Sequence, residues 1–293
     1  MVKGTIVPVV TPFTAEGEID EKAYKNLIDW HVSENVDVII TFGTTGEAPT
    51  LTDEEQHRLL KIALDVSNKR VPIYAGTGTY DTRKTIKNTE HAKELGADGC
   101  LLVVPYYNKP TPEGCIAHYT AINKVGLPMM VYHHPGRTGI KLSAQTLAEI
   151  CHLSNVVALK DCAADFELLQ EFCKISETPV ISGDDTLVYK MMELGAKGIC
   201  SVVANVIPGP WKEMTASFLR GDRQRAKEIE TQYAPLYNAL TLETNPMCVK
   251  YAVSLLGKCE PYMRLPLVQP KDATKLAILQ AMSSVMGSAL IEK

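Results

Sequence analysis

Lys160 is the residue of this sequence whose position most strongly indicates chemistry. It closes an apolar run that begins at Val156, and Asp161 follows it directly. Short apolar runs rich in β-branched residues are typical of buried strands, so a lysine at the end of one faces a dry interior. Burial there disfavours the ammonium form, and the neutral amine attacks carbonyl carbons to give a Schiff base. The alternative is a lysine that turns outward to solvent, as most lysines do.

Other reactive side chains follow the ends of further apolar runs. They lie in the segments Gly43–Glu47, Pro105–Pro110, Tyr132–Gly139 and Ser182–Asp185. Thr44 and Thr45, between two glycines, can offer hydroxyl and backbone N–H groups to a carboxylate, although the glycines would also suit an ordinary tight turn. Tyr107 offers a phenol, with packing as its commoner use, and Arg137 offers a guanidinium unless it is a surface charge. With an amine nucleophile, this set suits a 2-oxo acid that is captured as an imine and then reacts as an enamine.

The elements that must position these residues alternate regularly along the chain. The strand-like runs are Thr5–Val10, Val36–Phe42, Val71–Ala75, Cys100–Val104, Pro128–Tyr132, Val156–Lys160, Pro179–Ser182 and Gly198–Val203. Helical patterns separate them, and about eight such units in about 220 residues predict an α/β fold of the (β/α)8 TIM-barrel type. No convincing strand follows, so we expect residues 1–220 to form the barrel and residues 221–293 a C-terminal α-helical extension packed on it.

Three of the predicted helices have recognisable first residues. Thr52 and Glu55 form a capping-box pattern, and Thr111 stands before a proline at the first helical position. Asp20 precedes apolar residues that recur on one helical face. These signals place helices between the first and second runs, between the second and third, and between the fourth and fifth.

Composition and motifs argue against several classes of protein. A net charge of −4 with scattered Lys and Arg argues against a nucleic-acid partner. No apolar stretch reaches about 18 residues and no signal-peptide pattern is present, so we expect a cytoplasmic protein without a membrane partner. The eight cysteines lack metal or redox spacing, and His133 and His134 lack a third ligand, so neither a metal nor another cofactor is expected. The GTG and GTTGE segments do not complete a nucleotide-binding motif.

Five ordered motifs carry a resemblance that covers nearly the whole chain. They are GTTGE from Gly43, PYYNKPTPEG from Pro105, Y-x-x-P-x-R-T-G from Tyr132, VVALKD from Val156 and SGDD from Ser182. In these motifs the chain resembles the dihydrodipicolinate synthase / N-acetylneuraminate lyase superfamily. GTT in the first motif, together with Arg137, favours the synthase branch over the sialic acid lyases.

The resemblance implies condensation of pyruvate with L-aspartate 4-semialdehyde to 4-hydroxy-tetrahydrodipicolinate, on the route to diaminopimelate and lysine. It implies that Lys160 forms the Schiff base with pyruvate and that Thr44, Tyr132 and Tyr107 relay protons. Implied substrate-binding residues are Thr45 for the pyruvate carboxylate, Arg137 for the semialdehyde carboxylate, and Gly183 and the backbone at Cys200 for the pyruvate pocket. Tyr107 would enter the site of a neighbouring subunit, which implies a homo-oligomer, at least a tight dimer and commonly a homotetramer.

The sequence departs from the family pattern at several positions, and two alternative functions remain open. His133, Ala48 and Cys200 stand where relatives usually carry Asn, Ser and Ile, and we expect His133 and Cys200 to affect the second-substrate pocket. Lys84 would repel the ammonium groups of free lysine, so we expect feedback inhibition to be absent or weak. The alternatives are a pyruvate-dependent aldolase that cleaves N-acetylneuraminate or a 2-keto-3-deoxy sugar acid, and a barrel that binds a ligand without catalysis.

Overall fold

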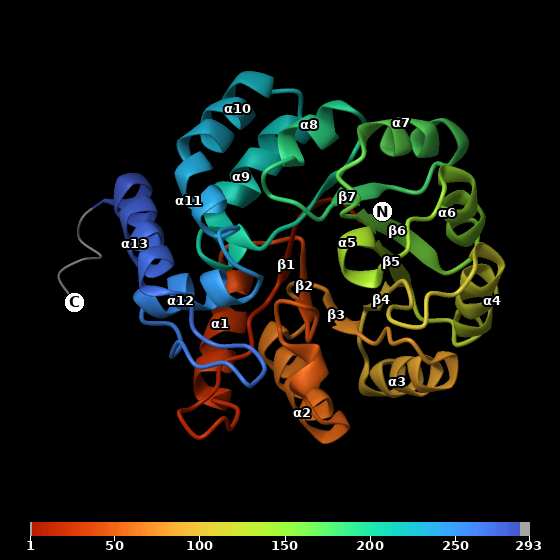
Figure 1. Ribbon diagram of the computed structural model, residues 1–293, viewed down its shortest axis with the longest axis horizontal. Coiled ribbons are helices and arrows are strands. Elements are labelled where there is room, and N and C mark those ends of the chain that lie inside the picture. The colour runs from red at the N-terminus through yellow and green to blue at the C-terminus, as the bar shows by residue number, and fades with distance from the viewer. Residues whose placement is uncertain (1, 288–293) are drawn as a thin grey trace.

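A closed barrel of eight parallel strands lies at the centre of the computed structural model, which describes residues 2–287 (Figure 1). The strands are β1 (Gly4–Pro8), β2 (Val38–Thr41), β3 (Ile73–Gly76), β4 (Gly99–Val103), β5 (Met129–His133), β6 (Val156–Asp161), β7 (Val180–Ser182) and β8 (Gly198–Cys200). Each strand pairs with the next, and β8 closes the barrel against β1. Each predicted run overlaps one strand, and the predicted TIM barrel is confirmed.

Helices cover the outside of the barrel between successive strands (Figure 1). They are α1 (Glu21–Ser33), α2 (Asp53–Ser67), α3 (Thr82–Leu95), α4 (Pro112–Asn123), α6 (Ala144–Cys151), α7 (Phe166–Ile175), α8 (Val188–Glu193) and α9 (Pro208–Leu219). The predicted helix starts are confirmed: the side chains of Asp20, Thr52 and Thr111 each accept a backbone N–H of the first helical turn. Three short helical turns lie in loops, namely η1 (Ala48–Thr50), α5 (Pro135–Thr138) and η2 (Val203–Asn205).

The end of β8 differs from the predicted run, which continued to Val203. The carboxylate of Asp185 accepts the backbone N–H groups of Val202 and Val203 at 2.8 and 3.0 Å. It also accepts the Ser201 hydroxyl and the indole N–H of Trp211. These bonds draw the chain out of the sheet after Cys200, so the apolar residues that follow are buried in η2 instead of a strand.

Four further helices follow the barrel units within the described chain: α10 (Arg223–Gln232), α11 (Ala234–Ala239), α12 (Met247–Leu255) and α13 (Asp272–Met286). Helix α13 packs on α11 and α12 (Figure 1). Helices without strands were expected here, and residues 221–287 agree. The division after residue 220 stays a prediction, and residues 288–293 lie outside the described part. No helix within residues 2–287 is both long and apolar enough to cross a bilayer.

Two cations of the C-terminal segment hold the loop that follows β2. Lys250 donates to the carboxylate of Glu47, and both side chains are fully buried. Lys250 also donates to the Tyr262 carbonyl oxygen at 3.0 Å. The Arg264 guanidinium forms a bidentate salt bridge with Glu55, with N···O distances of 2.7 and 2.5 Å. The backbone N–H of Arg264 donates to the Glu47 carboxylate. The loop that carries GTTGE is therefore fixed to the last third of the chain.

We expect Lys250→Met to lower the free energy of unfolding by about 3–5 kcal/mol, because Glu47 would be left as a buried charge without a partner. Urea denaturation followed by circular dichroism measures this change. Lys190→Met is the matched control: it removes an exposed pair with Glu193 and should cost less than about 1 kcal/mol. Equal small losses in both variants would contradict the role given to the buried pair.

Candidate active site

The side chain of Lys160 points into the mouth of the barrel. Residues alternate between the two faces of β6, which places Ala158 and Lys160 inside and Asp161 outside. Lys160 is only 6% exposed, and its Nζ lies 4.0 Å from the centre of the Tyr132 ring on β5. The outward, solvated orientation that the sequence left open is therefore not the one observed.

Two thiols and a phenol that keep their protons at neutral pH lie against Lys160. Burial disfavours the ammonium form of Lys160, whereas ionised Cys200, Tyr132 and Cys162 would raise its pKa. These neighbours do not ionise near pH 7, because burial raises their own pKa values, that of Cys162 to about 12. With these neighbours protonated, burial is the largest influence, and it lowers the pKa of Lys160 toward the neutral amine.

Gly183, directly after β7, leaves the space that Lys160 occupies. A methyl group at Gly183 would lie 2.9 Å from Lys160 Cε and 2.0 Å from Cys162 Sγ. The backbone cannot move aside freely, since the Gly183 N–H donates to the Asp161 carbonyl oxygen at 2.9 Å. The absence of a side chain at this position is therefore a requirement of the site.

A cavity of about 230 Å³ opens above Lys160 at the carboxyl ends of the strands. The predicted site residues that line it are Thr44, Thr45, Tyr132, Arg137, Lys160 and Gly183. Cys200 lies below it, in the cluster of side chains that fills the barrel. Tyr107 lies outside it: its side chain is 89% exposed, and its backbone has a φ of 71°.

The C-terminal segment contributes residues that the sequence reasoning did not identify. Asn245 lines the cavity, and its Nδ2 donates to Thr45 Oγ1 at 3.0 Å. Its carbonyl oxygen accepts from Arg137 Nη2 at 3.3 Å, and its Oδ1 is buried without a partner in the described chain. The LETNP segment that contains Asn245 was a visible signature, but its spacing gave no reason to place it at the barrel mouth.

The two histidines that follow Tyr132 face in different directions. His133 is fully buried, with Nδ1 2.8 Å from Asp161 Oδ1, and its Nε2 accepts the Leu142 N–H at 3.2 Å. It holds β5 to β6 from outside the barrel and lines no part of the cavity, so the expectation that it shapes the second-substrate pocket is wrong. His134 is the histidine that lines the cavity.

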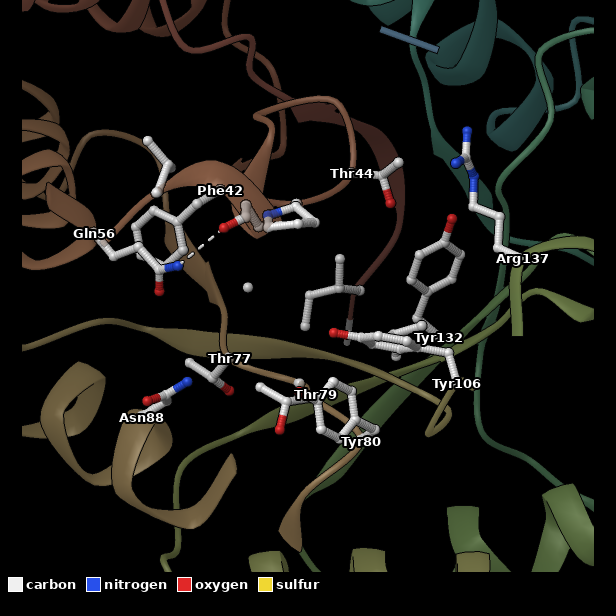
Figure 2. A pocket seen from close by; sticks show the side chains of 18 of the residues that line it. Phe42, Thr44, Gln56, Thr77, Thr79, Tyr80, Asn88, Tyr106, Tyr132 and Arg137 are labelled. Carbon is white, nitrogen blue, oxygen red and sulfur yellow. Dashed lines mark hydrogen bonds between the residues drawn. The ribbon is translucent and has the colours of Figure 1, made fainter. Parts of the chain in front are cut away.

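A second cavity, of about 540 Å³, adjoins the first along Thr44, Tyr132 and Arg137 (Figure 2). Tyr106 also lines it, and its ring meets the Tyr80 ring edge-on with centres 5.3 Å apart. Other lining residues are Ala48, Gln56 and Lys84, and Gln56 donates to the Ala48 carbonyl oxygen, as the dashed line in Figure 2 shows. Ala48 therefore belongs to this cavity and not to the one above Lys160.

The protein-family comparison agrees with this arrangement. The model of the dihydrodipicolinate synthetase family matches residues 1–284. The chain belongs to this family. A 4-hydroxy-tetrahydrodipicolinate synthase of Geotalea daltonii is 42% identical over 285 residues, which cover 96% of this chain and 98% of the relative. A relative from Geotalea uraniireducens with the same name is 41% identical over 96% of this chain and 98% of its own.

Solved structures of family members share the fold. The crystal structure of dihydrodipicolinate synthase from Aquifex aeolicus is 40% identical, with a TM-score of 0.94 and coverage of 96% of this chain and 97% of that one. The chloride-inhibited enzyme from Acinetobacter baumannii, solved in complex with pyruvate, is 39% identical, with a TM-score of 0.95 and coverage of 98% and 99%.

We expect Gly183→Ala to slow the reductive trapping of a 2-oxo acid on Lys160, because the added methyl group overlaps Cys162 and displaces the lysine. Overpacking of this kind also lowers stability by about 1–3 kcal/mol. Mass spectrometry of the borohydride-treated protein and thermal unfolding measure both effects. Gly136→Ala is the control, since its methyl group would meet the His134 ring at ordinary distances of 3.5 and 3.6 Å. Unchanged trapping and stability in Gly183→Ala would contradict the steric argument.

Proposed function

We propose that Lys160 is the Schiff-base nucleophile of the reaction that condenses pyruvate with L-aspartate 4-semialdehyde. The chain is an enzyme with the activity of a 4-hydroxy-tetrahydrodipicolinate synthase, a class I aldolase-type lyase of lysine and diaminopimelate biosynthesis. The observation that carries the proposal is the buried amine of Lys160 at the floor of a polar cavity. Several full-length relatives near 40% identity share the synthase name, which favours the synthase over the sugar-acid lyase and the non-catalytic alternatives.

The first half of the reaction uses Lys160 and Tyr132. The neutral amine attacks C2 of pyruvate, and loss of one water gives the imine. Removal of a proton from the methyl group then gives the enamine, whose carbon attacks the aldehyde carbon of the second substrate. Burial raises the pKa of Tyr132, so its phenol keeps its proton at neutral pH and can pass one to a leaving hydroxyl and take another back. Thr44, beside Tyr132 in Figure 2, and Tyr107 are the proposed partners of that relay.

The two carboxylates of the substrates have separate partners in this proposal. Thr45 Oγ1 already accepts a bond from Asn245, so its own hydrogen remains to be donated to the pyruvate carboxylate. Arg137 lines both cavities and uses one N–H on the Asn245 carbonyl, which leaves further donors for the carboxylate of the semialdehyde. Gly183 and the backbone at Cys200 complete the pyruvate pocket.

The active form in this proposal is a cytoplasmic homo-oligomer, at least a tight dimer and commonly a tetramer. Tyr107 motivates this proposal, because a large aromatic residue is held fully outward in a left-handed backbone conformation. Such strain costs about 1–3 kcal/mol and persists where it serves a function. A Tyr107 side chain that enters the site of a second copy would supply the third group of the proton relay.

Incubation with pyruvate and borohydride is expected to add one reduced pyruvate per chain, on the peptide that carries Lys160. Peptide mapping by mass spectrometry locates the adduct. Lys160→Arg should abolish it, because a guanidinium stays protonated and cannot attack a carbonyl. An adduct on Lys109 or another lysine, with Lys160 unmodified, would contradict the assignment of Lys160 as the nucleophile.

Hybrid oligomers test the position of Tyr107. Tyr107→Phe removes only a transferable proton, so turnover should fall while pyruvate trapping on Lys160 is retained. Co-refolded Lys160→Ala and Tyr107→Phe subunits should recover part of the activity, since some sites then combine an intact lysine with an intact phenol. If verified hybrids remain as inactive as the two parents, Tyr107 does not act across a subunit boundary.

A further inference from the structure

The imidazole of His134 lines the cavity and has no role in the mechanism above. His134 follows β5, lines the same cavity as Lys160, and has its ring centre 5.8 Å from that of Tyr132. Its Nδ1 is buried and makes no hydrogen bond within residues 2–287. The reasoning from sequence considered His134 only as a metal ligand.

The enclosed Nδ1 fixes which edge of the ring a ligand can reach. A methyl group at Gly136 would lie 3.6 Å from Nδ1, so that nitrogen is packed against the chain that follows. Nε2 is not among the buried atoms without a partner and makes no hydrogen bond within residues 2–287, so we take it as the ring nitrogen that is open to the cavity. The neutral ring carries one proton, on one of its two nitrogens. We assign that proton to Nδ1, which leaves the Nε2 lone pair directed to the cavity as a hydrogen-bond acceptor.

The surroundings keep His134 uncharged. Burial lowers its pKa to about 4, and the positive charge of the nearby Arg137 acts in the same direction. At neutral pH the ring can accept a hydrogen bond from a cationic group without repelling it. The three carboxylates that line the same cavity already have partners in the protein. Asp185 accepts four hydrogen bonds, Asp184 Oδ1 accepts two from Thr186, and Glu243 Oε1 accepts the Lys271 N–H.

We propose that His134 is a specificity-determining residue that accepts a hydrogen bond from the α-ammonium group of the second substrate. The proposal rests on the proposed function. L-Aspartate 4-semialdehyde carries its ammonium and carboxylate groups on one carbon atom, so a carboxylate at Arg137 brings the ammonium group close to that guanidinium. The ammonium group then needs a neutral or anionic acceptor nearby, and His134, three residues earlier on the same cavity wall, supplies one. His134 thus selects an amino-acid aldehyde over an aldehyde without the amine.

Two aldehydes that differ only in the amine test this directly. Succinic semialdehyde has the aldehyde and the carboxylate of L-aspartate 4-semialdehyde but no ammonium group. We expect His134→Val to lower kcat/KM for L-aspartate 4-semialdehyde about 10- to 100-fold, the range of one charge-assisted hydrogen bond. The inhibition constant of succinic semialdehyde on the pyruvate-loaded enzyme should change less than about threefold. His134→Gln, which keeps an acceptor, should retain most of the activity.

The controls distinguish a failure of the ammonium contact from a failure of the proposed function on which it rests. Arg137→Ala should weaken both aldehydes alike, since both carry the carboxylate. If His134→Val weakens both aldehydes equally, or neither of them, the ammonium contact is overturned. The same holds if the loss that is selective for L-aspartate 4-semialdehyde is found in Asp184→Asn and not in His134→Val. In each of those cases one pyruvate per chain is still trapped on Lys160, which also shows that the variant is folded. Absence of that adduct in the unmodified chain would overturn the proposed function and this contact with it.

Discussion

The proposed chemistry of this chain depends on the buried amine of Lys160, which forms no salt bridge within residues 2–287. The groups with the largest electrostatic effects on its pKa are two thiols and a phenol, which burial keeps protonated. Lys250 is equally buried, but it is bonded to Glu47 and holds a loop in place. In our proposal the same side chain is a nucleophile at Lys160 and a structural cation at Lys250, according to whether its charge is compensated.

The barrel mouth is built from parts that lie far apart in the sequence. β6 and β7 provide Lys160 and the space at Gly183, whereas the loop after β2 provides the threonines. The helices that follow the barrel are part of the same construction. Asn245 bonds to both Thr45 and Arg137, and Lys250 fixes Glu47 at the end of the threonine loop. An insertion or truncation in this segment would therefore disturb the site and not only the periphery.

Much of this architecture could be predicted because its causes are local. Strands buried on both faces appear as continuous apolar runs, and helix caps depend on residues three apart, as at Thr52 and Glu55. The position of Lys160 followed from the strand that it ends. The contact of Asn245 with Thr45 spans 200 residues and leaves no periodic signal. The opposite orientations of His133 and His134 depend on how the chain turns after β5, which two adjacent identical residues cannot indicate.

The pH dependence of imine formation tests the central claim most directly. The rate of reductive trapping of pyruvate on Lys160 should be measured across neutral and alkaline pH, at constant pyruvate and with Lys160→Arg as the blank. If burial without a counter-charge makes Lys160 a nucleophile, the rate should level off at an apparent pKa below the 10.5 of an ordinary lysine. A rate that keeps rising tenfold per pH unit through 10.5 would show that the ammonium form is stabilised in the site, and would contradict the account.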